Sequence, residues 1–182
     1  MKAVMMSIQP KWCELIASGK KTVEVRKTRP KLETPFKCYI YQTKKAWLYD
    51  IYSVIAGWQR KVIGEFVCDE ISWIGQCGLV VKEDAEKVLK GTCLSCNEVY
   101  NYLGLPKPQN DDKYRECYGW HISDLVIYDE PKELSEFVVK HKKTVFSNEY
   151  NIEGIVYYPK EETVFKKLTK PPQSWCYVEE LR

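Results

Sequence analysis

The residue types best suited to chemistry stand in one run of eight residues, Gly19-Lys20-Lys21-Thr22-Val23-Glu24-Val25-Arg26. If the run is a strand, its side chains alternate, and Thr22, Glu24 and Arg26 share one face. Lys21 then lies at the turn before the strand. Two nearby cations keep a carboxylate ionised, and the carboxylate in turn orients them. The N–H donors left over suit a phosphate or a base edge, so the run predicts an anion-binding or nucleotide-binding site around Lys21, Glu24 and Arg26.

Further cations surround this run and extend its positive surface, among them Lys20, Lys27 and Arg29. Residues 1–61 hold 13 Lys and Arg against 4 Asp and Glu, a balance of +9, whereas residues 62–182 hold 15 against 21, a balance of −6. Such an asymmetry favours an acidic partner for the first third of the chain. The plain alternative is that these cations only solvate an exposed face, with Glu24 and Arg26 as a surface ion pair.

The elements that must position these residues are a strand, a helix and a second strand. Residues 3–8 read as the first strand, and Pro10 suits the first position of the following helix, where Ser7 or Gln9 is the expected cap. Trp12, Leu15 and Ile16 give the helix one apolar face. Gly19 then ends it in a conformation with positive φ and starts the strand over 21–26.

The rest of the chain predicts short strands with irregularly placed helices. We expect further strands over 36–42, over 61–71 with a bulge at Gly64, over 118–128 as one strand or a bent pair, and over 175–179. Helices are expected over 83–89 and from Ser95, where Glu98 completes a capping box, and a surface loop over 104–118. This order indicates a single α+β domain over 1–182, built around a small curved β-sheet or β-barrel with flanking helices.

The pattern Gly-x-Lys-x-x-Glu-x-Arg, filled by Gly19, Lys21, Glu24 and Arg26, resembles the signature of ASCH domains, relatives of the PUA fold. The flanking segments that resemble the family are 7–10, 64–66, 120–123 with Pro131, and 171–175. The least familiar part, about 75–118, reads as a helical and loop insertion. The resemblance implies a PUA-like fold with a cleft floored by the 21–26 strand, and it implies an RNA-binding or nucleotide-binding module.

Some members of the family are enzymes, which leaves a hydrolase open as an alternative function. A bacterial branch that resembles this chain at Gly19-x-Lys21-Thr22 hydrolyses an acetylated cytidine, with the lysine as base toward a threonine at the place of Glu24. A carboxylate cannot replace that hydroxyl without a change of mechanism, although Thr22 stands nearby. Other members are ribonucleases, and Lys21 with Glu24 offers an acid–base pair for that reaction. The catalytic candidates are therefore Lys21, Glu24, Thr22 and His121.

Weaker signals concern metals, cofactors and location. Cys93-x-x-Cys96 is half of a zinc motif without a second half, so no metal or other cofactor is expected. His121 follows Trp120 in an apolar strand and is either half-buried or a catalyst. The sequence shows no secretory signal and no apolar run long enough to cross a membrane, so we expect reduced cysteines and a cytoplasmic protein without a membrane partner. A protein-interaction module around 46–58 is a third possible function.

Overall fold

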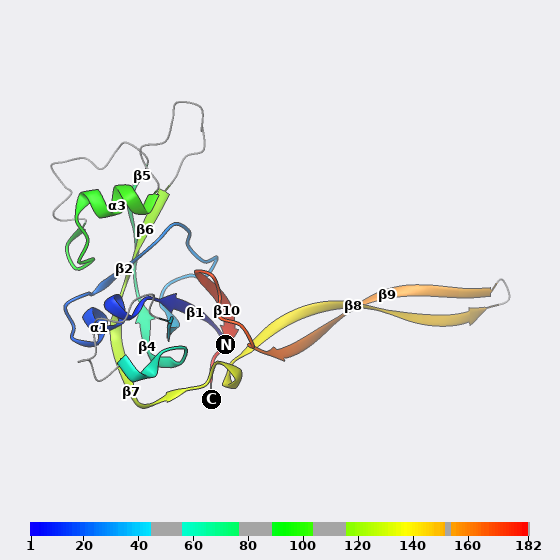
Figure 1. Ribbon diagram of the computed structural model, residues 1–182. Helices are drawn as coiled ribbons and strands as arrows, with labels where there is room; N and C mark the ends of the chain where they lie inside the picture. The colour runs from blue at the N-terminus through cyan, green and yellow to red at the C-terminus, as the bar shows by residue number, and fades with distance from the viewer. Residues whose placement is uncertain (45–55, 77–88, 104–115, 152–153, 182) are drawn as a thin grey trace.

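The computed structural model describes residues 1–44, 56–76, 89–103, 116–151 and 154–181. Two small sheets and two short helices form a body from which a long β-hairpin projects (Figure 1). The α+β class predicted from the sequence is confirmed. A closed β-barrel, which that prediction included, is not found. Within the described ranges the strands form separate open sheets.

The larger sheet has five strands in the order β10-β1-β3-β4-β7. Their bounds are Lys2–Ile8 (β1), Phe36–Gln42 (β3), Val62–Cys68 (β4), Ser123–Lys132 (β7) and Trp175–Glu179 (β10). β1 runs parallel to β3 and antiparallel to β10, and the other pairs are antiparallel. The strands predicted over 36–42 and 175–179 are confirmed with the expected bounds.

Both faces of β1 are buried from Ala3 to Ile8, which explains its apolar run over residues 3–6 in place of an alternating pattern. On one face Val4, Met6 and Ile8 pack with Ile16 of the first helix and with Trp120. The other face carries a second cluster, which includes Ala3, Met5, Tyr39 and Phe137. β1 is therefore a central strand held rigidly on both sides, and the chain leaves it toward the candidate site at a fixed position.

Helix α1, Pro10–Ala17, begins and ends as the sequence predicts. Pro10 takes its first position and Gln9 is the N-cap residue, although none of the described side chains caps the helix. Gly19 has a φ of 71° and donates its backbone N–H to the carbonyl of Ile16 over 2.9 Å. Because this conformation favours glycine, Gly19 reverses the chain and directs it into the next strand.

The second sheet has three strands in the order β2-β6-β5, with bounds Val23–Arg26 (β2), Glu116–His121 (β6) and Ile71–Gln76 (β5). Helix α3, Cys96–Leu103, packs on it through a cluster that includes Val25, Ile74, Val99 and Leu103. Its predicted capping box is present, since Ser95 N–H donates to Glu98 Oε2 over 2.8 Å and Glu98 N–H donates to Ser95 Oγ over 3.3 Å.

Two predicted boundaries are wrong. The strand expected over 61–71 ends at Cys68, because the exposed Asp69 and Glu70 turn the chain into β5 of the other sheet. The loop expected over 104–118 gives way at Glu116 to β6, and the bent pair expected over 118–128 is β6 followed by β7. The bulge expected at Gly64 is confirmed, since the pairings of β4 with both neighbours shift register beside it.

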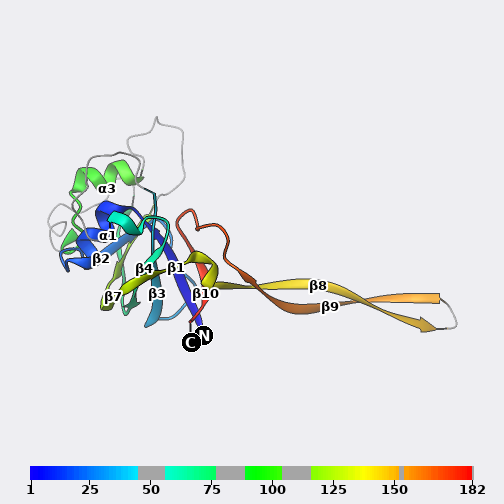
Figure 2. The same cartoon turned by 60° about the horizontal axis from the view of Figure 1, so that its bottom comes forward.

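The sequence reasoning missed the projecting hairpin, formed by β8 (Val138–Asn151) and β9 (Gly154–Lys167) (Figure 2). The two strands pair over their full length, from Val138 opposite Lys167 to Asn151 opposite Gly154. Short 3₁₀ turns stand at Ala56–Trp58 and Leu134–Glu136. The helix expected over 83–89 and the interaction segment expected over 46–58 lie almost wholly outside the described residues. None of the described helices has the length and apolarity needed to cross a bilayer.

Candidate functional site

Lys21, Glu24 and Arg26 meet beneath the surface, and we call them the buried triad. Their exposed fractions are 2%, 6% and 7% respectively. Lys21 Nζ lies 3.3 Å from Glu24 Oε2, and Arg26 Nη2 lies 3.0 Å from Glu24 Oε1. The alternation of β2 produces this arrangement, since it turns Glu24 and Arg26 to one face and Val25 to the cluster under α3. The alternative of a surface ion pair is therefore wrong.

The ammonium group of Lys21 is saturated by protein acceptors. It donates to the carbonyls of Val23 (2.8 Å) and Thr92 (2.6 Å), and Glu24 takes the third direction. Burial lowers the pKa of Lys21 below its usual value, and the neighbouring Glu24 carboxylate opposes this shift. Lys21 thus links the backbone at Val23 to the backbone at Thr92, and it also orients the Glu24 carboxylate.

The guanidinium of Arg26 connects three distant segments. Its Nη2 donates to the carbonyl of Ser7 over 2.7 Å, and its Nη1 reaches the carbonyl and hydroxyl of Ser174 at 3.4 and 3.3 Å. Its Nε–H is buried and has no hydrogen-bond partner among the described residues. Arg26 therefore ties β2 to the end of β1 and to the segment before β10, and it keeps few donors for a ligand.

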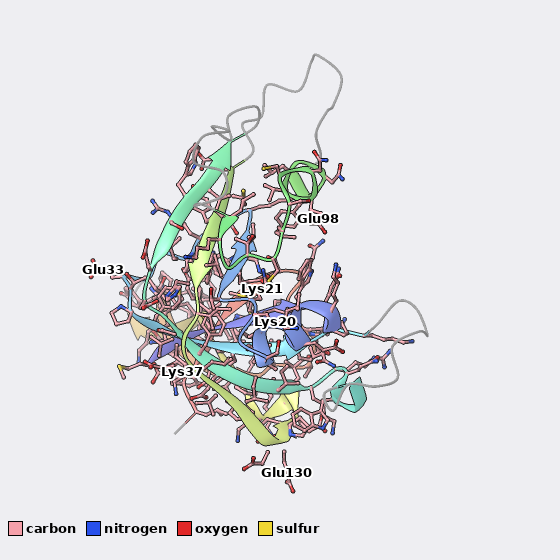
Figure 3. The ribbon with its side chains drawn as sticks, turned by 90° about the vertical axis from the view of Figure 1, so that its left-hand side faces the viewer. Lys20, Lys21, Glu33, Lys37, Glu98 and Glu130 are labelled. Carbon is pink, nitrogen blue, oxygen red and sulfur yellow. The ribbon has the colours of Figure 1, made fainter. Side chains whose placement is uncertain are left out.

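The triad forms part of the wall of a cavity of about 890 Å³. Apart from the triad, α1 contributes Trp12 and α3 contributes Glu98, Asn101 and Tyr102 to its lining, and Gln173 stands beside Ser174. Figure 3 shows α3, with Glu98, above the segment that carries Lys20 and Lys21. Tyr102 is 38% exposed, and Lys27 Nζ lies 4.8 Å from the centre of its ring. The cavity thus combines a buried charged wall with aromatic side chains.

The other cations predicted for the site divide into two groups. Lys27 lines the cavity, but Lys20 and Arg29 do not, and all three are exposed. The carbonyl of Lys20 lies 3.3 Å from Cys93 Sγ, which donates to it, and the Arg29 guanidinium stands 5.6 Å from the Tyr118 ring. Lys20 and Arg29 thus belong to the surface outside the cavity.

Thr22 and His121 lie outside the cavity lining. Thr22 precedes β2, is exposed, and donates its backbone N–H to the carbonyl of Gly91 over 2.8 Å, so the expectation that it shares the strand face of Glu24 is wrong. His121 Nδ1 lies 2.6 Å from Asp69 Oδ1, with both side chains nearly half exposed. The hydrogen bond with His121 lowers the pKa of the Asp69 carboxyl. His121 and Asp69 thus form a surface pair that is separate from the cavity.

The cysteines give no metal centre in the described part of the chain. The seven described cysteines form no disulfide with one another; Cys93 and Cys96 are exposed and Cys117 is buried. No group of three or more His, Cys, Asp or Glu side chains in the described ranges is placed to hold a metal ion. Burial raises the pKa of the Cys117 thiol to about 11, which keeps it protonated.

Sequence reasoning missed the residues that complete the site from other segments. The Thr92 carbonyl and the α3 residues Asn101 and Tyr102 come from the stretch predicted to be an unfamiliar insertion. No signal marks a backbone carbonyl in a sequence. Ser7 and Ser174 lie in segments that carried the family resemblance, and this was the one available signal for their proximity.

Comparisons with known proteins place this geometry in a family. The family model described as ASCH domain matches residues 6–172. Among solved structures, ASCH from Zymomonas mobilis is similar at a TM-score of 0.58 and 17% identity, covering 98% of this chain and 88% of that chain. Two mutant forms of ZmASCH match with TM-scores of 0.57 and 0.51, at 17% and 20% identity. They cover 98% and 74% of this chain, and 89% and 77% of theirs.

Comparison with curated protein sequences gives no match. The likeness to the solved structures concerns the fold, whereas the family model covers nearly the whole chain. On that match, the chain belongs to the ASCH domain family.

Proposed function

We propose that this protein binds single-stranded RNA and takes one nucleotide of it into the cavity beside the buried triad. The observation that carries the proposal is a cavity of about 890 Å³ with a charged wall of Lys21, Glu24 and Arg26 and with Trp12 and Tyr102 in its lining. Small-molecule sites typically enclose about 300–1,000 Å³. Proteins that read unpaired RNA stack splayed bases on aromatic side chains and hydrogen-bond their edges.

The surroundings of the cavity suit a polyanionic chain. Lys27 lines it beside Tyr102, and Lys11 stands over Trp12 with its Nζ 4.5 Å from the ring centre. Both lysines are exposed and can turn toward a phosphate. The surplus of +9 in residues 1–61 adds to their potential. The ASCH family is associated with RNA binding, and the proposal includes a cytoplasmic location, where RNA is available.

Binding of short labelled RNA, measured by fluorescence anisotropy at low and at physiological salt, tests the proposal. Affinity is expected to fall by about tenfold or more as salt rises, because counterions are released on binding. Lys27→Ala, which removes an exposed cation from the cavity lining, is expected to weaken binding, whereas Lys132→Ala, which removes a cation outside that lining, changes it little. Salt-insensitive binding, or equal effects of the two substitutions, would contradict the proposal.

One observation favours a second candidate, a hydrolase acting on RNA or on an acylated nucleoside. The lowered pKa of Lys21 moves its amine toward the neutral form that a general base needs. Against this, the three acceptors around Nζ hold its hydrogens away from a substrate. Incubation with acylated nucleosides and with RNA decides between them: turnover by the native protein that Lys21→Ala abolishes supports the hydrolase, and equal turnover or none removes it.

A further inference from the structure

The hydrogen-bond partners of the buried triad restrict which part of a nucleotide it can hold. Each hydrogen of the Lys21 ammonium has a protein acceptor. The two terminal nitrogens of Arg26, Nη1 and Nη2, also donate to protein acceptors. The remaining donor, Arg26 Nε–H, is buried in the wall. A phosphate at the triad would have to break existing hydrogen bonds and would face the Glu24 carboxylate. The triad is therefore poorly suited to a phosphate.

Glu24 is the member with hydrogen-bonding capacity to spare. Among the described residues, Oε1 contacts one donor, that of Arg26, and Oε2 contacts one donor, that of Lys21. A carboxylate accepts about four hydrogen bonds, so about half of its acceptor positions stay open. Since Glu24 lines the cavity, these positions are what the triad offers to a ligand. The ligand group that fits is one with two N–H donors side by side.

Among the standard bases, guanine alone carries two adjacent N–H donors on its Watson–Crick edge, the N1 imino group and the 2-amino group. Adenine and cytosine place an acceptor next to their single amino group, and uracil places its imino group between two acceptors. An acceptor set against a carboxylate is repelled. Resting on the RNA binding proposed above, we propose that the base held in the cavity is guanine, with its two N–H donors on Glu24.

The charges around the cavity agree with this orientation. With the base edge at Glu24, the sugar and phosphate point outward, toward the exposed Lys27 of the cavity lining and the exposed Lys11 over the Trp12 ring. Tyr102 and Trp12 both line the cavity, and a base that stacks on either ring takes the place of the exposed lysine now over it, Lys27 or Lys11. Base and phosphate thus each meet the groups that suit them, a carboxylate inside and ammonium groups outside.

A series of RNA ligands tests the inference on the unchanged protein. Labelled oligouridines with one central guanine, hypoxanthine, adenine or cytosine are compared by anisotropy. Hypoxanthine lacks only the 2-amino group of guanine. The guanine oligomer is expected to bind about tenfold or more tightly than the hypoxanthine one, because a matched pair of hydrogen bonds discriminates between bases to that extent. The adenine and cytosine oligomers are expected to be weaker than guanine as well.

The possible results separate this inference from the function on which it rests. Equal, salt-sensitive affinities across the series, or tighter binding of adenine or cytosine, would leave RNA binding standing and remove guanine. Absence of binding by every oligomer would remove both. Glu24→Gln should abolish the guanine preference, whereas Glu65→Gln, outside the cavity, should keep it. If Glu24→Gln fails to fold, the ligand series decides alone.

Discussion

Lys21, Glu24 and Arg26 carry two positive charges and one negative charge into a space that excludes most water. Such a cluster loses hydration that its internal attraction only partly restores, so it is a weak source of stability. The carbonyls of Val23, Thr92 and Ser7 compensate by accepting the remaining hydrogens. These hydrogen bonds hold the Glu24 carboxylate in a fixed position in the cavity wall, which the proposed function requires.

Removing the acid from this cluster should be far more costly than breaking an exposed ion pair. Glu24→Ala leaves two buried cations without their counter-charge, and we expect a loss of about 3–5 kcal/mol in the free energy of unfolding. The matched control is Glu161→Ala, because Glu161 pairs with Lys142 at 2.6 Å while the side chains are 64% and 73% exposed. That change should leave the free energy of unfolding nearly unchanged. Equal losses in urea unfolding would contradict this account of the triad.

Glu65 provides a pH-dependent contribution outside the site. Lys37 donates to its Oε1 over 2.7 Å and the Tyr128 hydroxyl donates to its Oε2 over 2.6 Å. Burial alone raises the pKa of Glu65, but these hydrogen bonds outweigh it and leave the pKa below its usual value. The pKa of Glu65 is lower in the folded state than in the unfolded state. Its stabilisation is therefore fully present at pH values above the unfolded-state pKa and is lost as the pH falls through the folded-state pKa.

We expect the difference in the free energy of unfolding between the native protein and Glu65→Gln to depend on pH. The native protein should be more stable by about 1 kcal/mol near neutral pH, and the difference should shrink as pH falls below the ordinary carboxyl value of about 4.3. Urea unfolding of both proteins at several pH values measures it. A difference that stays constant or grows in acid would show that Glu65 does not act through its charge.

At the scale of elements, the helix-to-strand connection through Gly19 could be predicted because local rules determine it. Pro10 at the helix start, glycine at its end and alternation in the strand each act over a few residues. The β8–β9 hairpin could not be predicted in the same way. Exposed side chains such as Phe146, Tyr157 and Phe165 stand among lysines on it, so no alternation of buried and polar residues marks its strands.

A substitution at Gly64 shows whether β4 requires a glycine there because β7 packs so closely, rather than because the backbone must be flexible. A Cβ at this position would overlap the Val126 carbonyl oxygen and stand 3.1 Å from Ile127 Cα, both backbone atoms of β7. Gly64→Ala is therefore expected to cost about 1–3 kcal/mol. Gly57→Ala is the control, because a Cβ there meets no atom of the described residues within 4 Å. Thermal unfolding compares them, and equal midpoints would contradict the steric explanation.

At the scale of the whole molecule, the cavity joins segments far apart in the chain. It brings together the end of β1, β2, α3 and the stretch before β10. The sequence predicts which residues of β2 point to one side, because alternation is local. It cannot predict that Tyr102 or Ser174 faces them, because these contacts depend on how the two sheets pack. The uneven charge is visible in the sequence, but its division between cavity and outer surface is not.

The most direct test of RNA binding at the cavity compares alanine substitutions of two tyrosines, one in the cavity lining and one outside it. Tyr102 lines the cavity, and Tyr157 is exposed on the hairpin. If an RNA base enters the cavity, Tyr102→Ala should weaken binding of a short labelled RNA by about 1–3 kcal/mol, or roughly 5-fold to 150-fold. Tyr157→Ala should leave the affinity unchanged. Unchanged binding by Tyr102→Ala, or an equal loss in both variants, would contradict RNA binding at this cavity.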